Sequence, residues 1–258
     1  MDSSKLIVSF YAKNIVAIVD KNLEIECFYR LERPMGIAPI DNNQFYVIGK
    51  EGLFLFEYRS NFIVLKNLKK LYFNNYHDCH KLNNIILVNS KLGIIEEVEG
   101  NYYQPAINPN MTKDNHINCV AIKDNKIKYM TAFSEGTHTK AIEYKGILYD
   151  CQKEKVILKG LNKPHTPKLY KNQLWFCNSG EGTLNKGVTP VHYFETFTRG
   201  LAFINNFVYV GLSCMRRNKS YLTNSRCGIA KLNITTNELI QEKIYKQGLQ
   251  IYDIQLLK

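Results

Sequence analysis

Six segments of the chain repeat one pattern, and this repeat limits the possible folds more than any other feature. Each segment has a polar residue, a short apolar strand, a turn rich in Asn, Asp or Lys, and a second apolar strand. Asn and Asp accept the positive φ angles of tight turns, so each segment is predicted to be a β-hairpin. Five segments are complete, at 33–49, 77–90, 116–132, 165–179 and 199–213, and the sixth is divided between the two ends of the chain.

The spacing of the hairpins indicates the architecture. Further pairs of strand-like segments follow most of them, for example 52–58 with 62–68, so each unit is expected to hold four strands. Successive units begin roughly 35–50 residues apart, which is typical of propeller blades. The sequence therefore predicts an all-β fold, a single six-bladed β-propeller domain over residues 1–258. A β-sandwich or barrel is the main alternative, because short alternating strands also build those folds.

The two ends of the chain are predicted to complete one blade together. Residues 249–258 supply a single strand, whereas residues 5–30 supply three strand-like segments before the first complete hairpin. An open ring would leave unpaired strand edges, so pairing between the N- and C-terminal strands is expected to close it.

Composition favours a folded protein that stays in the cell. The chain is 45% hydrophobic and holds 17 Tyr and 13 Phe, which suit strands. No stretch approaches the roughly 18 apolar residues of a membrane span, and no basic segment with a long apolar run opens the chain. The seven cysteines form no CxxC pair, so neither a disulfide framework nor a zinc ribbon is indicated. We expect a cytoplasmic protein with reduced thiols and no membrane partner.

The net charge of +11 predicts attraction to anions. Nucleic acid, a membrane surface and an anionic small molecule all fit that charge. The lysines are scattered at apparent turns, and no RNA- or DNA-binding motif accompanies them, so no specific nucleic-acid partner is expected.

Polar residues recur at equivalent places in the repeat. In a propeller the inner strand of each blade begins at one face of the central channel, and the second strand returns to that face. Residues at both places are therefore predicted to converge on one polar site. The inner-strand positions hold Arg33, His77, Asp78, His116, Asn118, His165, Arg199 and Asp253, and the second-strand ends hold Ser179, Glu181, Ser213 and Arg216.

Each of these residues has a candidate role. The catalytic candidates are His77, His116, His165 and Asp78, and the three histidines are also the hypothesised ligands of one divalent metal ion, the only cofactor considered. The substrate-binding candidates are Arg33, Asn118, Ser179, Glu181, Arg199, Ser213, Arg216 and Asp253, the arginines because guanidinium groups bind carboxylate or phosphate. The structural alternative is that a histidine at a strand start bonds backbone carbonyls and locks a blade.

These motifs resemble an uncharacterised bacterial protein family with a DUF4915-type domain. The resemblance runs nearly end to end and implies a propeller with shared site residues, but no established reaction. It rests on RPMGIA (33–38), HD (77–78), HIN (116–118), KPHTPKLYKNQLWFCNSGEG (163–182), FTRGLAF (197–203), VGLS (210–213), RCG (226–228) and IYD (251–253).

Two classes of function fit the sequence. The first is a small-molecule enzyme, a lyase, hydrolase or isomerase, that acts on an anionic or sugar-like substrate at a channel mouth lined by His and Arg. The second is a non-catalytic propeller that binds a glycan, peptide or protein partner with the same residues. Fold alone cannot choose between them, because propellers serve both purposes.

Overall fold

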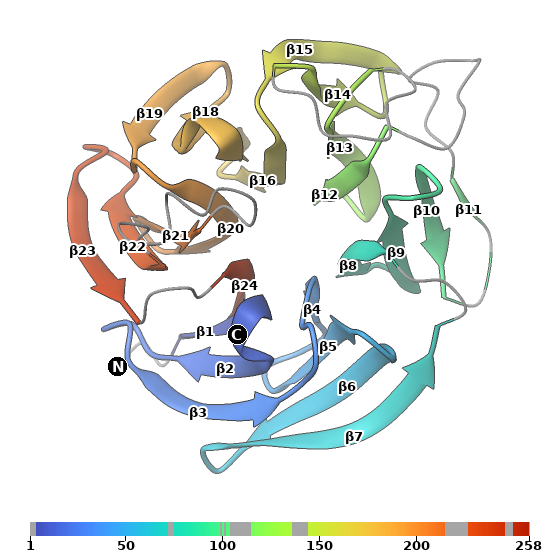
Figure 1. The fold of residues 1–258 in the computed structure, drawn as a ribbon, viewed down its shortest axis with the longest axis vertical. Coiled ribbons are helices and arrows are strands. Elements are labelled where there is room, and N and C mark those ends of the chain that lie inside the picture. Colours follow the sequence, from blue (N-terminus) through green and yellow to red (C-terminus); the bar gives the residue numbers. More distant parts are fainter. Residues whose placement is uncertain are drawn as a thin grey trace. The chain divides into compact units, whose positions relative to one another are not determined.

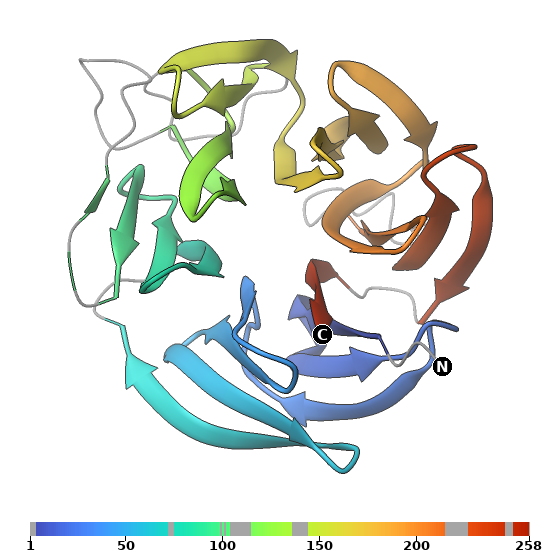
Figure 2. The ribbon, with the colours of Figure 1, turned by 180° about the vertical axis from the view of Figure 1, so that it is seen from behind.

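The computed structural model describes residues 4–71, 75–98, 100, 102–103, 115–135, 144–214, 227–245 and 250–257. The described strands form six sheets of four strands each (Figures 1 and 2), and the fold is a six-bladed β-propeller. The predicted fold class is confirmed. The prediction that residues 1–258 act as one domain stays a prediction.

The chain divides into two compact units, the first formed by Met1–Asn74 with Arg199–Lys258. It holds three sheets, and strand β20 crosses the boundary at Arg199. One sheet is β24 (Ile251–Leu257), β1 (Lys5–Phe10), β2 (Ile15–Val19) and β3 (Ile25–Arg30), with the 3-10 helix η1 (Tyr11–Lys13) after β1. The next is β4 (Ile37–Pro39), β5 (Gln44–Gly49), β6 (Gly52–Arg59) and β7 (Phe62–Lys70). The third is β20 (Phe197–Ile204), β21 (Phe207–Ser213), β22 (Gly228–Asn233) and β23 (Leu239–Ile244).

The second unit, Asn75–Thr198, also holds three sheets. One is β8 (Tyr76–Lys81), β9 (Ile85–Asn89), β10 (Ile94–Glu97) and β11 (Tyr102–Tyr103). The next is β12 (Ile117–Lys123), β13 (Lys126–Ala132), β14 (Gly146–Asp150) and β15 (Lys155–Leu161). The last is β16 (Pro164–Tyr170), β17 (Gln173–Asn178), β18 (Thr183–Lys186) and β19 (Thr189–Tyr193), with the 3-10 helix η2 (Ser179–Glu181) after β17.

Tight turns join the first two strands of the blades, as the repeat predicted. Both residues of the Asp124-Asn125 turn and of the Lys171-Asn172 turn have positive φ angles, between 49° and 59°. Two consecutive residues with positive φ form the hairpin turn that matches the right-handed twist of paired strands. At these two turns the Asn, Asp and Lys signal therefore marked hairpins of the predicted kind.

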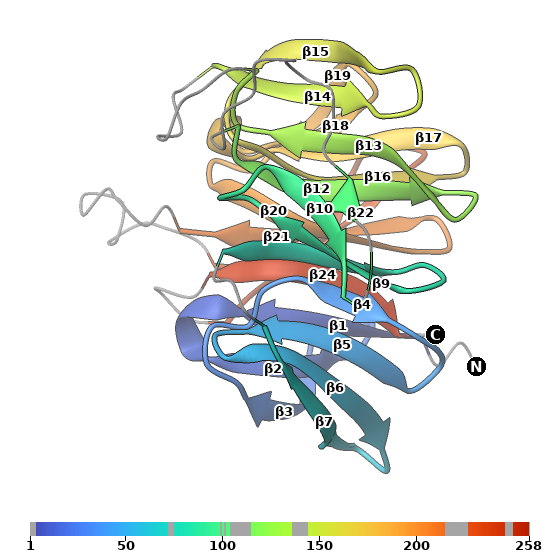
Figure 3. The ribbon, with the colours of Figure 1, turned by 90° about the vertical axis from the view of Figure 1, so that its right-hand side faces the viewer.

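The N- and C-terminal strands lie side by side in one sheet (Figure 3). Strand β24 pairs antiparallel with β1, from Lys5 opposite Leu257 to Phe10 opposite Ile251, and β1 pairs in turn with β2. That this pairing holds the ring closed stays a prediction, which is argued in the Discussion.

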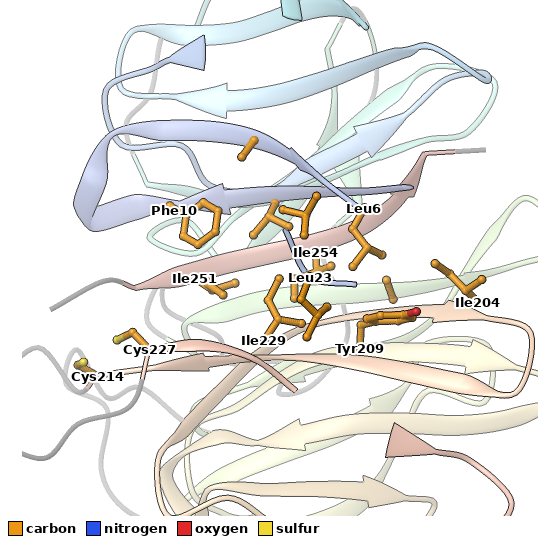
Figure 4. Close-up of a cluster of buried hydrophobic side chains, with 14 residues drawn as sticks. Leu6, Phe10, Leu23, Ile204, Tyr209, Cys214, Cys227, Ile229, Ile251 and Ile254 are labelled. Carbon is orange, nitrogen blue, oxygen red and sulfur yellow. The ribbon is translucent and has the colours of Figure 1, made fainter. Parts of the chain in front are cut away.

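Apolar clusters between neighbouring sheets form the core. In the first unit, Leu6 of β1 and Ile254 of β24 pack against Tyr209 and Ile229 of the β20–β23 sheet (Figure 4). On the other face of the β1 sheet, further apolar side chains pack against the β4–β7 sheet. The sheet that holds β1 therefore buries both of its faces against its two neighbours within this unit, which is how a propeller builds its core.

No helix in the described part of the chain is long and apolar enough to cross a membrane.

A largely buried ion pair links two strands of the second unit. The Lys128 ammonium lies 2.9 Å from both carboxylate oxygens of Asp150. Oδ1 of Asp150 also accepts the backbone N–H groups of Gln152 and Lys153. Burial alone would raise the pKa of Asp150, but Lys128 and the two N–H groups hold that pKa below its ordinary value of 3.8.

Asp150→Asn should therefore destabilise the protein in a pH-dependent way. A folded-state pKa below the unfolded value gives stability that is present above about pH 4 and is lost as the pH falls through the folded pKa. We expect the substitution to lower the free energy of unfolding by about 1–3 kcal/mol at pH 7. Urea unfolding at pH 7 and pH 3 should show this difference shrink at the lower pH, and an equal difference at both would contradict the assignment.

Candidate functional site

Three candidate histidines lie in one row of rings in the unit formed by residues 75–198. His77 is on β8, His116 directly precedes β12, and His165 is on β16. The His77 and His116 rings meet edge to face, with their centroids 4.9 Å apart. The described structure therefore brings together imidazoles that are 39 and 49 residues apart in sequence.

Two phenylalanines, which sequence reasoning missed, complete this aromatic row. Phe133 stacks on His116 at 4.5 Å and meets His165 edge to face at 5.2 Å. Phe197 lies at the end of the row beyond His165 and meets the His165 ring edge to face, with centroids 5.5 Å apart. The aromatic row is thus His77, His116, Phe133, His165 and Phe197, and all except His165 are partly exposed. Such a surface suits stacking against an apolar or sugar-like ring.

His165 has the contacts of a structural residue. It is only 1% exposed, and its Nδ1 lies 2.9 Å from both the Lys163 carbonyl oxygen and the Ser179 hydroxyl. A carbonyl only accepts, so Nδ1 must carry the proton and donate. A protonated Nδ1 cannot take the Ser179 proton. The pair is therefore no nucleophile and general base, although a neutral His165 keeps Nε2 as an acceptor.

The hypothesised metal site gains no support from this arrangement. Among the described residues, no three His, Cys, Asp or Glu side chains are grouped closely enough to hold a metal ion. The reason is visible in the aromatic row, where the Phe133 ring contacts both His116 and His165.

Asp78 and Asp253 make matching contacts that tie one sheet to the next. Each uses Oδ1 to accept the N–H of the following residue, Cys79 or Ile254, at 3.0 and 2.8 Å. Each uses Oδ2 to accept a backbone N–H from the inner strand of the neighbouring sheet. For Asp78 this donor is Val120, at 3.1 Å, and for Asp253 it is Ile37, at 3.0 Å.

The same Oδ2 atoms also contact the side chain two residues further along the strand. His80 Nε2 lies 2.8 Å from Asp78, and Gln255 Nε2 lies 2.9 Å from Asp253. Asp78 thus orients His80, a histidine outside the three catalytic candidates. We name these two groups the aspartate clamps. Their contacts are those of blade-locking residues, and a role toward a substrate stays a hypothesis.

Arg199 makes an unusual contact in the other unit. It is 9% exposed, and its guanidinium carbon lies 3.2 Å from the centre of the Tyr252 ring. Tyr252 in turn stacks on Tyr11, with centroids 5.7 Å apart. Two guanidinium nitrogens, Nε and Nη2, are buried and have no hydrogen-bond partner within the described part of the chain. The sequence suggested that Arg199 either binds a ligand or pairs with Asp253, but it did not reveal this planar stack.

The remaining candidates have varied surroundings. Arg33 is exposed, and its backbone N–H donates to Asn14 Oδ1. Glu181 is the last residue of η2 and is partly exposed. The buried Asn118 accepts a bond from Thr131, and the buried Ser213 hydroxyl donates to the Ile251 carbonyl at 2.8 Å. Arg216 lies outside the described residues. That all the candidates line one cavity stays a prediction.

Solved structures similar to this chain share its fold. The "Crystal structure of Nidogen/Laminin Complex" gives a TM-score of 0.68 at 7% identity, covering 99% of this chain and 98% of that chain. A protein of unknown function from Bacteroides caccae gives a TM-score of 0.65 at 10% identity, covering 99% of both chains. At such low identities the likeness shows the propeller fold alone.

No curated protein matches the sequence. One family description, "Domain of unknown function (DUF4915)", matches residues 2–258. The match spans every blade of the propeller, including the strands that carry His77, His165 and Arg199. The chain therefore belongs to the DUF4915 family.

Proposed function

We propose that this propeller binds an anionic small molecule through Arg199. The observation that supports the proposal is the buried guanidinium, whose Nε and Nη2 have no hydrogen-bond partner among the residues that the structure describes. A buried cation is usually paired, because leaving water is costly unless another group replaces the lost hydrogen bonds. Here the Tyr252 ring supplies a cation–π contact to the face of the guanidinium, but it leaves these N–H groups unsatisfied.

The two unsatisfied nitrogens suit a ligand with paired oxygens. Nε and Nη2 stand on one edge of the guanidinium, and their N–H bonds point the same way. A carboxylate or phosphate can accept both in the two-point geometry that arginine makes with planar anions. Stacking on Tyr252 fixes the plane of the Arg199 guanidinium. The arginine side chain would therefore lose little conformational entropy when a ligand binds to this edge. The net charge of +11 also favours encounter with an anion.

The contacts around Arg199 favour binding over catalysis. Asp253 is the candidate carboxylate on the strand that carries Tyr252, and it already accepts the N–H groups of Ile37 and Ile254. A carboxylate occupied in this way is a poor general base. The enzyme hypothesis for His77, His116 and His165, with an anionic or sugar-like substrate, stays open as a second function, supported by the partly exposed rings of His77 and His116.

Arg199→Gln should strongly weaken anion binding while leaving the fold intact. Isothermal titration with inorganic phosphate, citrate and glucuronate at constant ionic strength should detect binding to the native protein. The variant should lose about 10- to 100-fold in affinity, since a charged two-point hydrogen bond contributes about 1.5–3 kcal/mol. Arg199→Lys keeps the charge without the paired N–H groups and should lose most of this affinity as well.

Arg59→Gln is the matched control, because Arg59 is an exposed arginine of the same unit. It should bind like the native protein. The proposal would be wrong if Arg199→Gln kept native affinity, if the control lost as much, or if the native protein bound none of the three anions.

A further inference from the structure

Two buried cysteines meet at one end of the apolar cluster in the first unit. Cys214 directly follows β21 and Cys227 directly precedes β22, and both side chains belong to the cluster that also holds Leu6 and Ile254. Figure 4 shows the two side chains close together at the end of these strands. Cys214 is 5% exposed and Cys227 is 0% exposed, and both are free thiols. The fold therefore holds two reduced sulfur atoms near each other in apolar surroundings.

The backbone positions of this pair suit a disulfide. Strands β21 and β22 pair antiparallel, and Leu212 opposite Gly228 is the pair nearest to the two cysteines. Antiparallel strands hold opposite Cα atoms about 4.5–5.5 Å apart. A disulfide spans Cα distances of about 4.4–6.8 Å, which includes this range. The thiols also contact each other, because the side chains of Cys214 and Cys227 form a hydrogen bond. A disulfide therefore requires little movement of the backbone.

We propose that Cys214 and Cys227 form a reversible disulfide when hydrogen peroxide reaches them, and that this bond locks the ends of β21 and β22 together. The Cys214 sulfur attacks one peroxide oxygen, the O–O bond breaks, and Cys214 sulfenic acid and water form. The Cys227 sulfur then attacks the sulfenic sulfur, the S–S bond forms, and a second water leaves. The two thiols lose two electrons and two protons, and one peroxide becomes two waters.

Burial sets the order and the pace of these steps. Cys214 is the more exposed of the two, so the oxidant reaches it first. Burial, followed by the hydrogen bond with Cys214, raises the pKa of Cys227 above its ordinary value of 9.0. Cys227 is therefore a protonated thiol at pH 7, and a thiol is a much weaker nucleophile than a thiolate. The second step should be slow, and the pair should stay reduced until an oxidant is added.

The disulfide would affect strand β24 as well as its own sheet. The Cys214 carbonyl accepts the side-chain amide of Gln250 at 3.0 Å, and the neighbouring Ser213 hydroxyl donates to the Ile251 carbonyl at 2.8 Å. Fixing the chain at Cys214 therefore also fixes the start of β24, the strand that pairs with β1. The expected effect is on stability, so this proposal does not depend on anion binding by Arg199.

Peptide mapping tests the bond directly. The full chain is treated with hydrogen peroxide, unfolded in urea with N-ethylmaleimide to block free thiols, and digested with trypsin. The disulfide would join the tryptic peptides 200–216 and 227–231, each of which holds one cysteine. Mass spectrometry should find this joined peptide after oxidation, and dithiothreitol should remove it. The oxidised protein should melt about 5–10 °C above the reduced protein, because the bond closes a loop in the unfolded chain.

Three variants complete the test. Cys214→Ala and Cys227→Ala should each lose the joined peptide and the rise in melting temperature, and their melts under reducing conditions show what the substitution itself does to stability. Cys27→Ala is the matched control, because Cys27 is a more accessible cysteine of the same unit, and this variant should keep both effects. The proposal would be overturned if peroxide gave no joined peptide in the native protein, if it joined Cys27 or two separate molecules instead, or if the oxidised protein melted no higher than the reduced protein.

Discussion

Deleting residues 249–258 should leave a chain that does not fold. The deletion removes β24, the inner strand that pairs with β1. It also removes Ile251 and Ile254 from one apolar cluster and Leu257 from another. Each large buried side chain contributes about 2–5 kcal/mol, so the loss of all three is comparable to the typical total stability of about 5–15 kcal/mol. The bared β1 edge should also promote aggregation.

Three measurements check this expectation. Soluble yield and the circular dichroism melt should show loss of the native state, and a synthetic peptide of residues 249–258 added in trans should restore part of it. Ile254→Ala is the graded control, because it creates a cavity on the same strand and should lower stability without preventing folding. A truncated protein that melts like the full chain would show that β24 does not close the ring.

Much of the fold could be predicted from sequence because the signals are local and repeated. Turn residues such as Asp124 and Asn125 mark hairpins through their own backbone preferences, and six repeats make a chance pattern improbable. The two terminal strands could be assigned to one sheet because an incomplete blade at each end leaves a strand unpaired. None of these inferences requires knowing which residues distant in the sequence contact each other in the folded protein.

The roles of the site residues could not be predicted in the same way. His77, His116 and His165 occupy equivalent places in the repeat, yet His165 is buried on Ser179 and the Lys163 carbonyl while the other two remain partly exposed. Phe133 follows a strand end and reads as an ordinary core residue in the sequence. These differences depend on which neighbouring sheet each side chain meets.

Arg199 and Tyr252 illustrate the same limit. The sequence places both on inner strands, but it carries no signal that a guanidinium and a ring 53 residues apart will stack. The polar character of the inner-strand positions was therefore predictable. The sequence could not predict whether the residue at a given position binds a ligand or forms hydrogen bonds to the neighbouring sheet.

The aspartate clamps give the second large expected effect. Asp78→Ala and Asp253→Ala each leave two backbone N–H groups without their acceptor, one of them on the neighbouring sheet. Each unsatisfied buried donor costs about 1–3 kcal/mol, so each substitution should lower the free energy of unfolding by about 2–5 kcal/mol. For a protein of this size the melting temperature should fall by about 5–15 °C.

Asparagine should not rescue either clamp, and this sets the structural role apart from a ligand-binding role. Both carboxylate oxygens of Asp253 accept N–H bonds, and an asparagine amide would turn one of them into a donor that faces another donor. Asp253→Asn and Asp78→Asn should therefore melt nearly as early as the alanine variants. Asp124→Asn, at an exposed turn where asparagine is equally suited, should melt like the native protein. If the clamp variants instead kept the native melting temperature and lost only anion binding, the two aspartates would be ligand-binding residues, and the locking of neighbouring sheets would need another source.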